Sequence, residues 1–89
     1  MEPADETLML GYAGGDARAF EAPYTRHKGP LFRFVLRSVK SAGEAEELAQ
    51  EIWMRIIGAR AGYEPKAKFT TWLYSIAHNR LVDHWRAPR

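Results

Sequence analysis

The sequence predicts an all-α fold, a compact bundle of about four helices. Apolar residues recur three and four positions apart along most of the 89-residue chain, which is the spacing of one face of a helix. No stretch alternates apolar and polar residues as a half-buried strand does, and no internal repeat is present. We therefore expect one small helical domain at residues 1–86, and the start of an interdomain linker at residues 87–89.

The first helix is expected at about residues 5–13. Its first turn contains Asp5 and Glu6, which favour a helix N-terminus because that end has a partial positive charge. Gly14 and Gly15 follow, and they end the helix.

The second helix is expected at about residues 17–38, with Asp16 as its N-cap. Proline lacks the backbone N–H that a helix interior uses, and its ring clashes with the preceding turn. Pro30 therefore predicts a kink or a break near residues 28–30.

The third helix is expected at about residues 42–58. Ser41 is a suitable N-cap, and Glu44 three residues later completes a capping box. The residues predicted to be buried share one apolar face: Ala45, Leu48, Ala49, Ile52 and Ile56. The opposite face is expected to be exposed and contains Glu47, Gln50, Glu51 and Met54.

The fourth helix is expected at about residues 71–85, with Thr70 as its cap. Leu73, Ala77 and Leu81 share one face at helical spacing, which predicts that they pack in the core. A second face contains Trp72, Ile76 and Asn79. One face can therefore pack while the other binds.

Charge is distributed unevenly, although the net charge is only +2. Residues 1–22 contain one cation and five acids, whereas residues 58–89 contain six cations and two acids. A basic C-terminal third predicts a local site for a polyanion. Asymmetry of this kind also arises by chance in a short chain, so charge alone does not decide the point.

The segment that leads into the fourth helix combines three kinds of side chain that bind single-stranded nucleic acid. Aromatic rings can stack on bases, the Asn79 amide can donate and accept at a base edge, and cations can contact phosphates. The stacking candidates are Tyr63 and Trp72, and the phosphate candidates are Lys66, Lys68 and Arg80. For any one aromatic residue a place in the core is the better interpretation, and only the ensemble favours binding.

The acidic face of the third helix has two interpretations. Carboxylates can bind the arginines of a partner helix through paired hydrogen bonds, and methionine adapts to an irregular partner surface. A run of charges is more often a solvated face, so this pattern alone leaves both interpretations open. The residues concerned are Glu44, Glu46, Glu47, Gln50, Glu51, Trp53 and Met54.

The sequence predicts no catalytic, metal or cofactor site. It has no cysteine, and its three histidines, His27, His78 and His84, are not spaced as a metal-binding pair. No glycine-rich phosphate loop or nucleophile motif is present, so we expect no enzyme activity, metal or cofactor. No apolar run reaches the roughly 20 residues of a membrane-spanning helix, so we expect a cytoplasmic protein without membrane insertion.

Four blocks of sequence occur in a fixed order, at residues 8–21, 24–34, 45–55 and 69–79. The third block has the sequence AEELAQEIWMR, and the fourth has the sequence FTTWLYSIAHN. Together they resemble region 2 of the extracytoplasmic-function (ECF) sigma factors of bacterial RNA polymerase. The resemblance spans most of the chain, and four blocks at the right spacing are far more specific than any one of them.

The resemblance implies that the chain binds core RNA polymerase and the promoter minus-ten element in transcription initiation. On the third helix it assigns contact with the clamp helices of the polymerase β′ subunit to Glu47, Gln50, Glu51, Met54 and Arg55. On the connecting loop and fourth helix it assigns capture of a flipped base of the promoter non-template strand, with contacts to the backbone, to Ala59, Tyr63, Lys66, Lys68, Phe69, Trp72, Ile76, Asn79 and Arg80. Capture of an extruded base favours strand opening.

The resemblance also implies a regulatory partner, an anti-sigma factor. The alternative function is therefore a protein-interaction module that such a factor binds and that does not itself bind DNA. A duplex-binding helix-turn-helix is less favoured, because aromatic and amide side chains dominate here. Primary sigma factors have a second tryptophan where this chain has Leu73, and ECF sigma factors have a C-terminal region that reads the minus-thirty-five element. We therefore expect this chain to be part of a longer factor.

Overall fold

The computed structural model describes residues 3–86. This part of the chain consists of helices and their connections, without a strand, which confirms the all-α prediction. Its elements are α1 (Asp5–Ala13), the 3-10 helix η1 (Ala17–Phe20), α2 (Glu21–Ser38), α3 (Ala42–Ala59), the 3-10 helix η2 (Arg60–Gly62) and α4 (Phe69–Arg86). The predicted linker at residues 87–89 lies outside the described residues.

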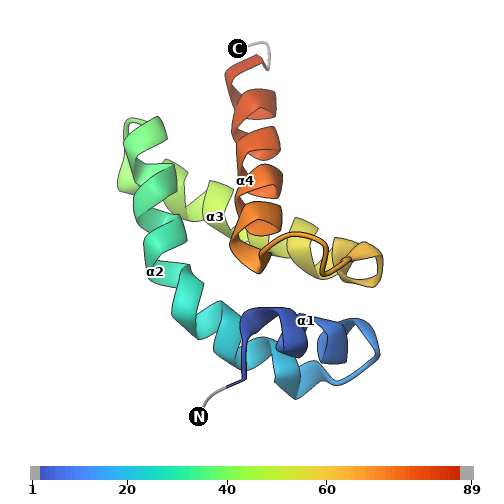
Figure 1. The fold of residues 1–89 in the computed structure, drawn as a ribbon. Coiled ribbons are helices and arrows are strands. Elements are labelled where there is room, and N and C mark those ends of the chain that lie inside the picture. The colour runs from blue at the N-terminus through green and yellow to red at the C-terminus, as the bar shows by residue number, and fades with distance from the viewer. Residues whose placement is uncertain (1–2, 87–89) are drawn as a thin grey trace.

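The helices pack into an elongated bundle that measures 42 × 23 × 20 Å. Figure 1 shows α1 against the N-terminal half of α2, and α4 on the side of α2 where that helix ends. Helix α3 contacts both α2 and α4. The loop at residues 63–68 connects the far end of α3 to the start of α4, close to α1 (Figure 1).

The core lies where the four helices meet. Met9 of α1 and Leu31 and Val35 of α2 are fully buried there. The predicted core faces of the last two long helices are confirmed, since all their members are buried: Ala45, Leu48, Ala49, Ile52 and Ile56 on α3, and Leu73, Ala77 and Leu81 on α4. Each face therefore follows from the helical period alone.

Of the kink or break predicted near residues 28–30, the break is wrong, because α2 continues through Pro30. A proline in a helix interior costs about 3 kcal/mol. Leu31 and Val35 follow on the core face, and burying side chains of this size stabilises by roughly 1.5–3 kcal/mol each. Their burial, which depends on the other helices, is large enough to offset the lost backbone hydrogen bond.

The chain direction changes before α2 rather than within it. Residues expected to begin the second helix form the separate 3-10 turn η1, and α2 begins at Glu21. Asp16 caps η1 as predicted, because its side chain accepts a hydrogen bond from the Arg18 N–H. Pro23 lies in the first turn of α2, where backbone N–H groups have no partner within the helix.

Of the caps predicted for α3 and α4, one is confirmed and one is wrong. Ser41 caps α3 as predicted, since its hydroxyl oxygen accepts a hydrogen bond from the Glu44 N–H at 3.2 Å. Thr70 is not the cap of α4, because that helix already begins at Phe69. The Phe69 N–H instead donates to the Glu6 carboxylate of α1 at 2.6 Å.

Candidate nucleic-acid and polymerase interfaces

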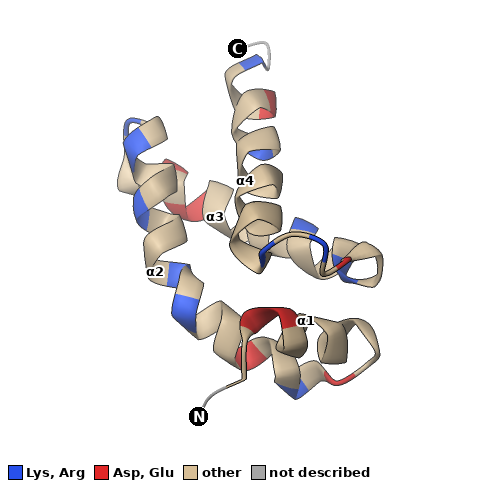
Figure 2. Cartoon of the chain, in the orientation of Figure 1, with Lys and Arg blue, Asp and Glu red and all other residues tan. Residues whose placement is uncertain are grey.

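The loop between η2 and α4 exposes the two predicted phosphate-binding lysines. Lys66 and Lys68 are both exposed, and Lys66 lies 3.2 Å from the exposed carboxylate of Glu64. Ala59, the last residue of α3, is exposed at the other end of this connection. Figure 2 shows basic residues on this loop and acidic residues at the start of α1. The loop therefore presents positive charge at the protein surface.

Tyr63 occupies a different place from the one expected for a stacking residue. Its side chain is only 5% exposed and contacts the rings of Trp72 and Phe69 edge-on, with centroids 5.1 and 6.4 Å away. Phe69 is fully buried. In this conformation neither ring has a free face on which a base could stack. Both rings instead pack against Trp72. Tyr63 was predicted to stack on a base, but in this structure its ring is buried and has no open face.

The Tyr63 phenol is in an unusual polar environment. Burial raises its pKa above the ordinary value, and the nearby carboxylates of Glu6 and Asp5 raise it further. Among the residues that the structure describes, its hydroxyl is buried without a hydrogen-bond partner. Such a group costs free energy unless something else satisfies it.

The second face of α4 is partly open, as predicted. Trp72 and Ile76 are half-buried, and Asn79 is exposed one turn beyond Ile76. These three side chains therefore form a strip that begins beside the connecting loop and ends in an amide that can donate and accept.

Arg80 is not free, although a phosphate contact is expected of it. Its Nε donates to the Glu51 carboxylate at 2.7 Å, and its Nη2 contacts the same oxygen. Arg55 likewise contacts Asp83 at 3.1 Å. Each pair joins α3 to α4, so residues expected to bind two different partners are bound to neighbours within the domain.

The outer face of α3 forms a shallow hollow of about 360 Å³. Met54 is 65% exposed there, which is unusual for so large an apolar side chain. The lining residues are Glu47, Gln50, Glu51 and Met54, four of the five residues predicted to contact polymerase.

A larger apolar groove of about 520 Å³ adjoins this hollow. Phe20, Tyr24 and Trp53 form a packed aromatic cluster in its lining, because the Trp53 ring contacts the other two edge-on, with centroids 5.9 and 4.9 Å away. The sequence did not predict this groove. The signal available in the sequence was the spacing of four residues between Phe20 and Tyr24. The groove is lined by Ala17, Phe20, Glu21, Tyr24, Gln50, Trp53, Met54 and Ile57.

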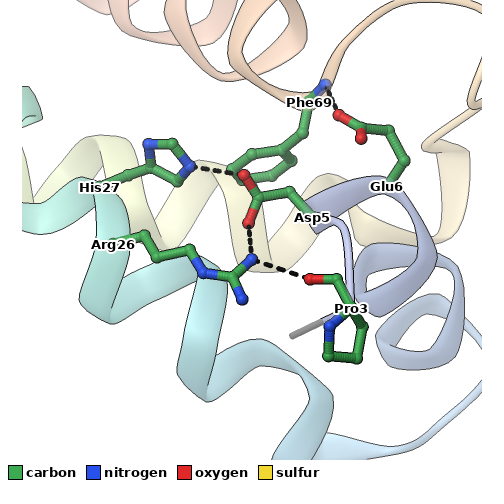
Figure 3. Close-up of polar contacts among 6 residues, drawn as sticks. All are labelled: Pro3, Asp5, Glu6, Arg26, His27 and Phe69. Atoms are coloured by element: carbon green, nitrogen blue, oxygen red, sulfur yellow. Dashed lines mark hydrogen bonds and ion pairs between the residues drawn. The ribbon is translucent and has the colours of Figure 1, made fainter. Parts of the chain in front are cut away.

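Two acidic residues of α1 contact the start of α4 and the side of α2, and the sequence did not predict these contacts. Glu6 binds the first N–H of α4, and Asp5 contacts Arg26 and His27 of α2, each at 2.8 Å (Figure 3). The described residues contain no group of three or more acidic, histidine or cysteine side chains placed to hold a metal. They also include no helix long and apolar enough to cross a membrane.

Comparison with known proteins identifies the family. The model of sigma-70 region 2 matches residues 23–89, about three quarters of the chain. The chain belongs to the sigma-70 region 2 family. This region 2 domain has curated relatives among RNA polymerase sigma factors. SigK, an ECF sigma factor of Mycolicibacterium vanbaalenii, is 30% identical over 85 residues, which cover 94% of this chain and 43% of SigK.

Two further relatives agree. CarQ of Myxococcus xanthus, an RNA polymerase sigma factor, is 35% identical over 91% of this chain and 47% of its own. The ECF sigma factor SigC of Mycobacterium tuberculosis is 34% identical over 99% of this chain and 47% of its own. The region 2 domain described here thus spans less than half the length of these curated relatives.

A solved structure resembles the whole bundle. An engineered region 2 of sigmaE, determined by NMR in complex with GTAAAA, matches with a TM-score of 0.84 and 29% sequence identity. The match covers 96% of this chain and 90% of that one. The arrangement of helices in this region 2 domain is therefore the one that its relative uses.

Proposed function

We propose that this domain binds the unpaired non-template strand of a promoter minus-ten element and docks on core RNA polymerase, as part of an ECF sigma factor. The family assignment and the names of the relatives support this proposal. So does the complex of the sigmaE region 2 with GTAAAA. The domain is proposed to act without catalysis, in the cytoplasm, where the polymerase acts.

The observation that carries the DNA half of the proposal is the exposed strip on α4. Asn79 offers both a donor and an acceptor to a base edge, and Ile76 and Trp72 provide an apolar floor beside it. Lys66 and Lys68 lie at the start of that strip, where they can contact phosphates. Tyr63 and Phe69 contribute by holding Trp72 in place.

The mechanism requires no covalent bond to be broken. Extrusion of a base from a duplex costs a few kcal/mol in lost stacking and pairing. A surface that binds only the extruded base returns part of that free energy, so strand opening becomes more favourable. The Asn79 amide supplies selectivity, because hydrogen-bonding groups differ between base edges.

The polymerase half of the proposal depends on the outer face of α3. The exposed Met54, Gln50 and two carboxylates offer an apolar contact with acidic residues around it, which suits a helix that presents arginines. The apolar groove beside it extends the contact surface toward α2. An anti-sigma factor would use the same exposed surfaces.

Titration with single-stranded oligonucleotides tests the DNA half. We expect binding of GTAAAA or of a single-position variant of it, at a stated salt concentration, and no comparable affinity for the same sequence as a duplex. Asn79→Ala should weaken binding about tenfold, the effect of losing a base contact worth 1–3 kcal/mol. His78→Ala is the matched control, because His78 is the exposed neighbour of Asn79. Equal affinities for the two variants would exclude the assignment of Asn79.

Co-elution with core polymerase tests the other half. Glu47→Lys is the clearer variant, because Glu51→Lys would also place a cation against Arg80. We expect reduced co-elution for Glu47→Lys and none of this loss for Glu64→Lys, which makes the same charge change on the loop. Tight binding to a protein partner, without polymerase binding or preference among oligonucleotides, would favour the interaction-module alternative.

A further inference from the structure

Helix α1 contacts both ends of the connecting loop. At the end where α4 begins, the Glu6 carboxylate accepts the Phe69 N–H at 2.6 Å (Figure 3). At the end where η2 begins, the Arg60 guanidinium lies 5.4 Å from the centre of the Tyr12 ring. Between these contacts Met9 is fully buried in the same core cluster as Phe69. The span of the loop is therefore fixed against α1.

Helix α1 is itself attached firmly to α2. Asp5 accepts a hydrogen bond from Arg26 at 2.8 Å and lies 2.8 Å from His27 Nε2 (Figure 3). Arg26 also donates to the Pro3 carbonyl at 3.1 Å. These contacts hold the segment that contains Glu6 in a defined position.

The Glu6 contact is an unusual helix cap. The first N–H groups of a helix lack partners, and a side-chain acceptor normally comes from the residue just before the helix. Here the acceptor comes from 63 residues earlier in the chain, while the Lys68 carbonyl accepts from Thr71 and Trp72. The residue at which loop becomes helix is thus set by α1, and that residue orients the exposed strip of α4.

We propose that Glu6 is a positioning residue for the single-strand site. It acts through the Phe69 N–H, which fixes the start of α4 and so the direction of Lys68 and of the Trp72 side chain. This inference rests on the proposed function, because it assigns Glu6 a role in binding the same strand.

The sign of the effect separates positioning from simple electrostatics. A carboxylate near a DNA site repels phosphates, so removal of its charge alone would strengthen binding. Loss of a positioning contact would weaken binding instead. Glu6→Ala removes both the charge and the acceptor, whereas Glu6→Gln removes the charge and keeps an acceptor oxygen.

The experiment combines amide exchange with oligonucleotide binding. In Glu6→Ala we expect the Phe69 amide to exchange at least about fivefold faster, which is the size of effect usual for losing a helix cap. We expect affinity for GTAAAA to fall by about the same factor, because the strand site depends on this helix start. Glu6→Gln should keep the Phe69 amide protected and bind within about twofold of the wild type. Glu21→Ala, which removes an exposed carboxylate of the groove proposed for polymerase and not of the strand site, is the charge-matched control and should not weaken oligonucleotide binding.

Provided that the wild type binds an oligonucleotide, three results would overturn the inference. The first is an unchanged Phe69 exchange rate in Glu6→Ala, and the second is a fast rate with affinity equal to that of Glu21→Ala. If Glu6→Ala does not fold, Glu6→Gln decides, and an unprotected Phe69 amide with wild-type affinity would be the third. If the wild type binds no oligonucleotide of the panel, the proposed function fails and the inference fails with it. If the wild type binds and Glu6→Ala binds equally well, only the inference fails.

Discussion

The contact between Glu51 and Arg80 allows us to predict how affinity for single-stranded DNA changes when the pair is broken. Arg80 donates to the Glu51 carboxylate through Nε at 2.7 Å and contacts it through Nη2 as well. In the Glu51→Gln variant the carboxylate charge is gone, and Arg80 is released from its strongest partner. We expect the released guanidinium to contact a phosphate of the bound strand.

The exposure of the two side chains sets the expected size of the effect. The Arg80 side chain is 19% exposed and that of Glu51 is 52% exposed, so water screens the pair substantially. A pair of this kind contributes about 1 kcal/mol, which is the upper end for surface pairs and corresponds to about a fivefold change in affinity. One additional phosphate contact on a single strand also makes the slope of log K against log salt more negative by about 0.7.

Fluorescence anisotropy with a labelled oligonucleotide, over about 50 to 200 mM salt, measures both quantities. Glu47→Gln is the matched control, because it makes the same charge change on the same face of α3. The double variant with Arg80→Ala should lose the gain of Glu51→Gln. A slope equal to that of Glu47→Gln, or a gain that survives removal of Arg80, would refute the reasoning.

Three further predictions concern stability. Leu73→Ala should lower the free energy of unfolding by about 2–5 kcal/mol in urea titrations, because Leu73 is fully buried, and a loss below about 1 kcal/mol would contradict its place in the core. Ser41→Ala should cost about 0.5–2 kcal/mol by the same measurement, and an unchanged midpoint would exclude its cap. Burial raises the folded-state pKa of Tyr63 above its ordinary value of 10.0, so the folded state holds the phenol proton more tightly than the unfolded state does. The free energy of unfolding is therefore unaffected by this group below about pH 10 and falls as the pH rises from there toward the folded-state pKa. Urea midpoints of the wild type should therefore fall more steeply above this pH than those of Tyr63→Phe, and parallel curves would disprove this.

The parts of the fold that the sequence predicted are those that local periodicity determines. The buried faces of α3 and α4 follow from apolar residues three and four apart, and the Ser41 cap follows from a neighbour three residues away. The path of α2 through Pro30 was not predictable in this way, because burial against other helices outweighs a local penalty.

The candidate site was predicted less completely, because its details depend on contacts between distant segments. The contact of Glu6 with Phe69 joins residues 63 positions apart, and the acidic first turn of α1 gives no sign of it. An aromatic residue in a loop does not reveal whether its ring is open, so Tyr63 was expected to stack and is instead buried. Residue type was enough to predict that Lys66, Lys68 and Asn79 are exposed, because polar side chains of this kind stay in solvent unless a packing partner buries them.

Residues expected to serve two separate partners are joined within this domain, and under the proposed function this pair would link the two binding events. A partner helix that offers an arginine to Glu51 competes with Arg80 for the same carboxylate. Such binding would release Arg80 toward the DNA strand, and by thermodynamic reciprocity a strand that withdraws Arg80 would leave Glu51 freer for the partner. Whichever partner binds first must break the pair between Glu51 and Arg80, and this costs free energy. The second partner then binds without that cost. Under the proposed function, polymerase and single-stranded DNA would each strengthen the binding of the other by up to the roughly fivefold that the pair contributes.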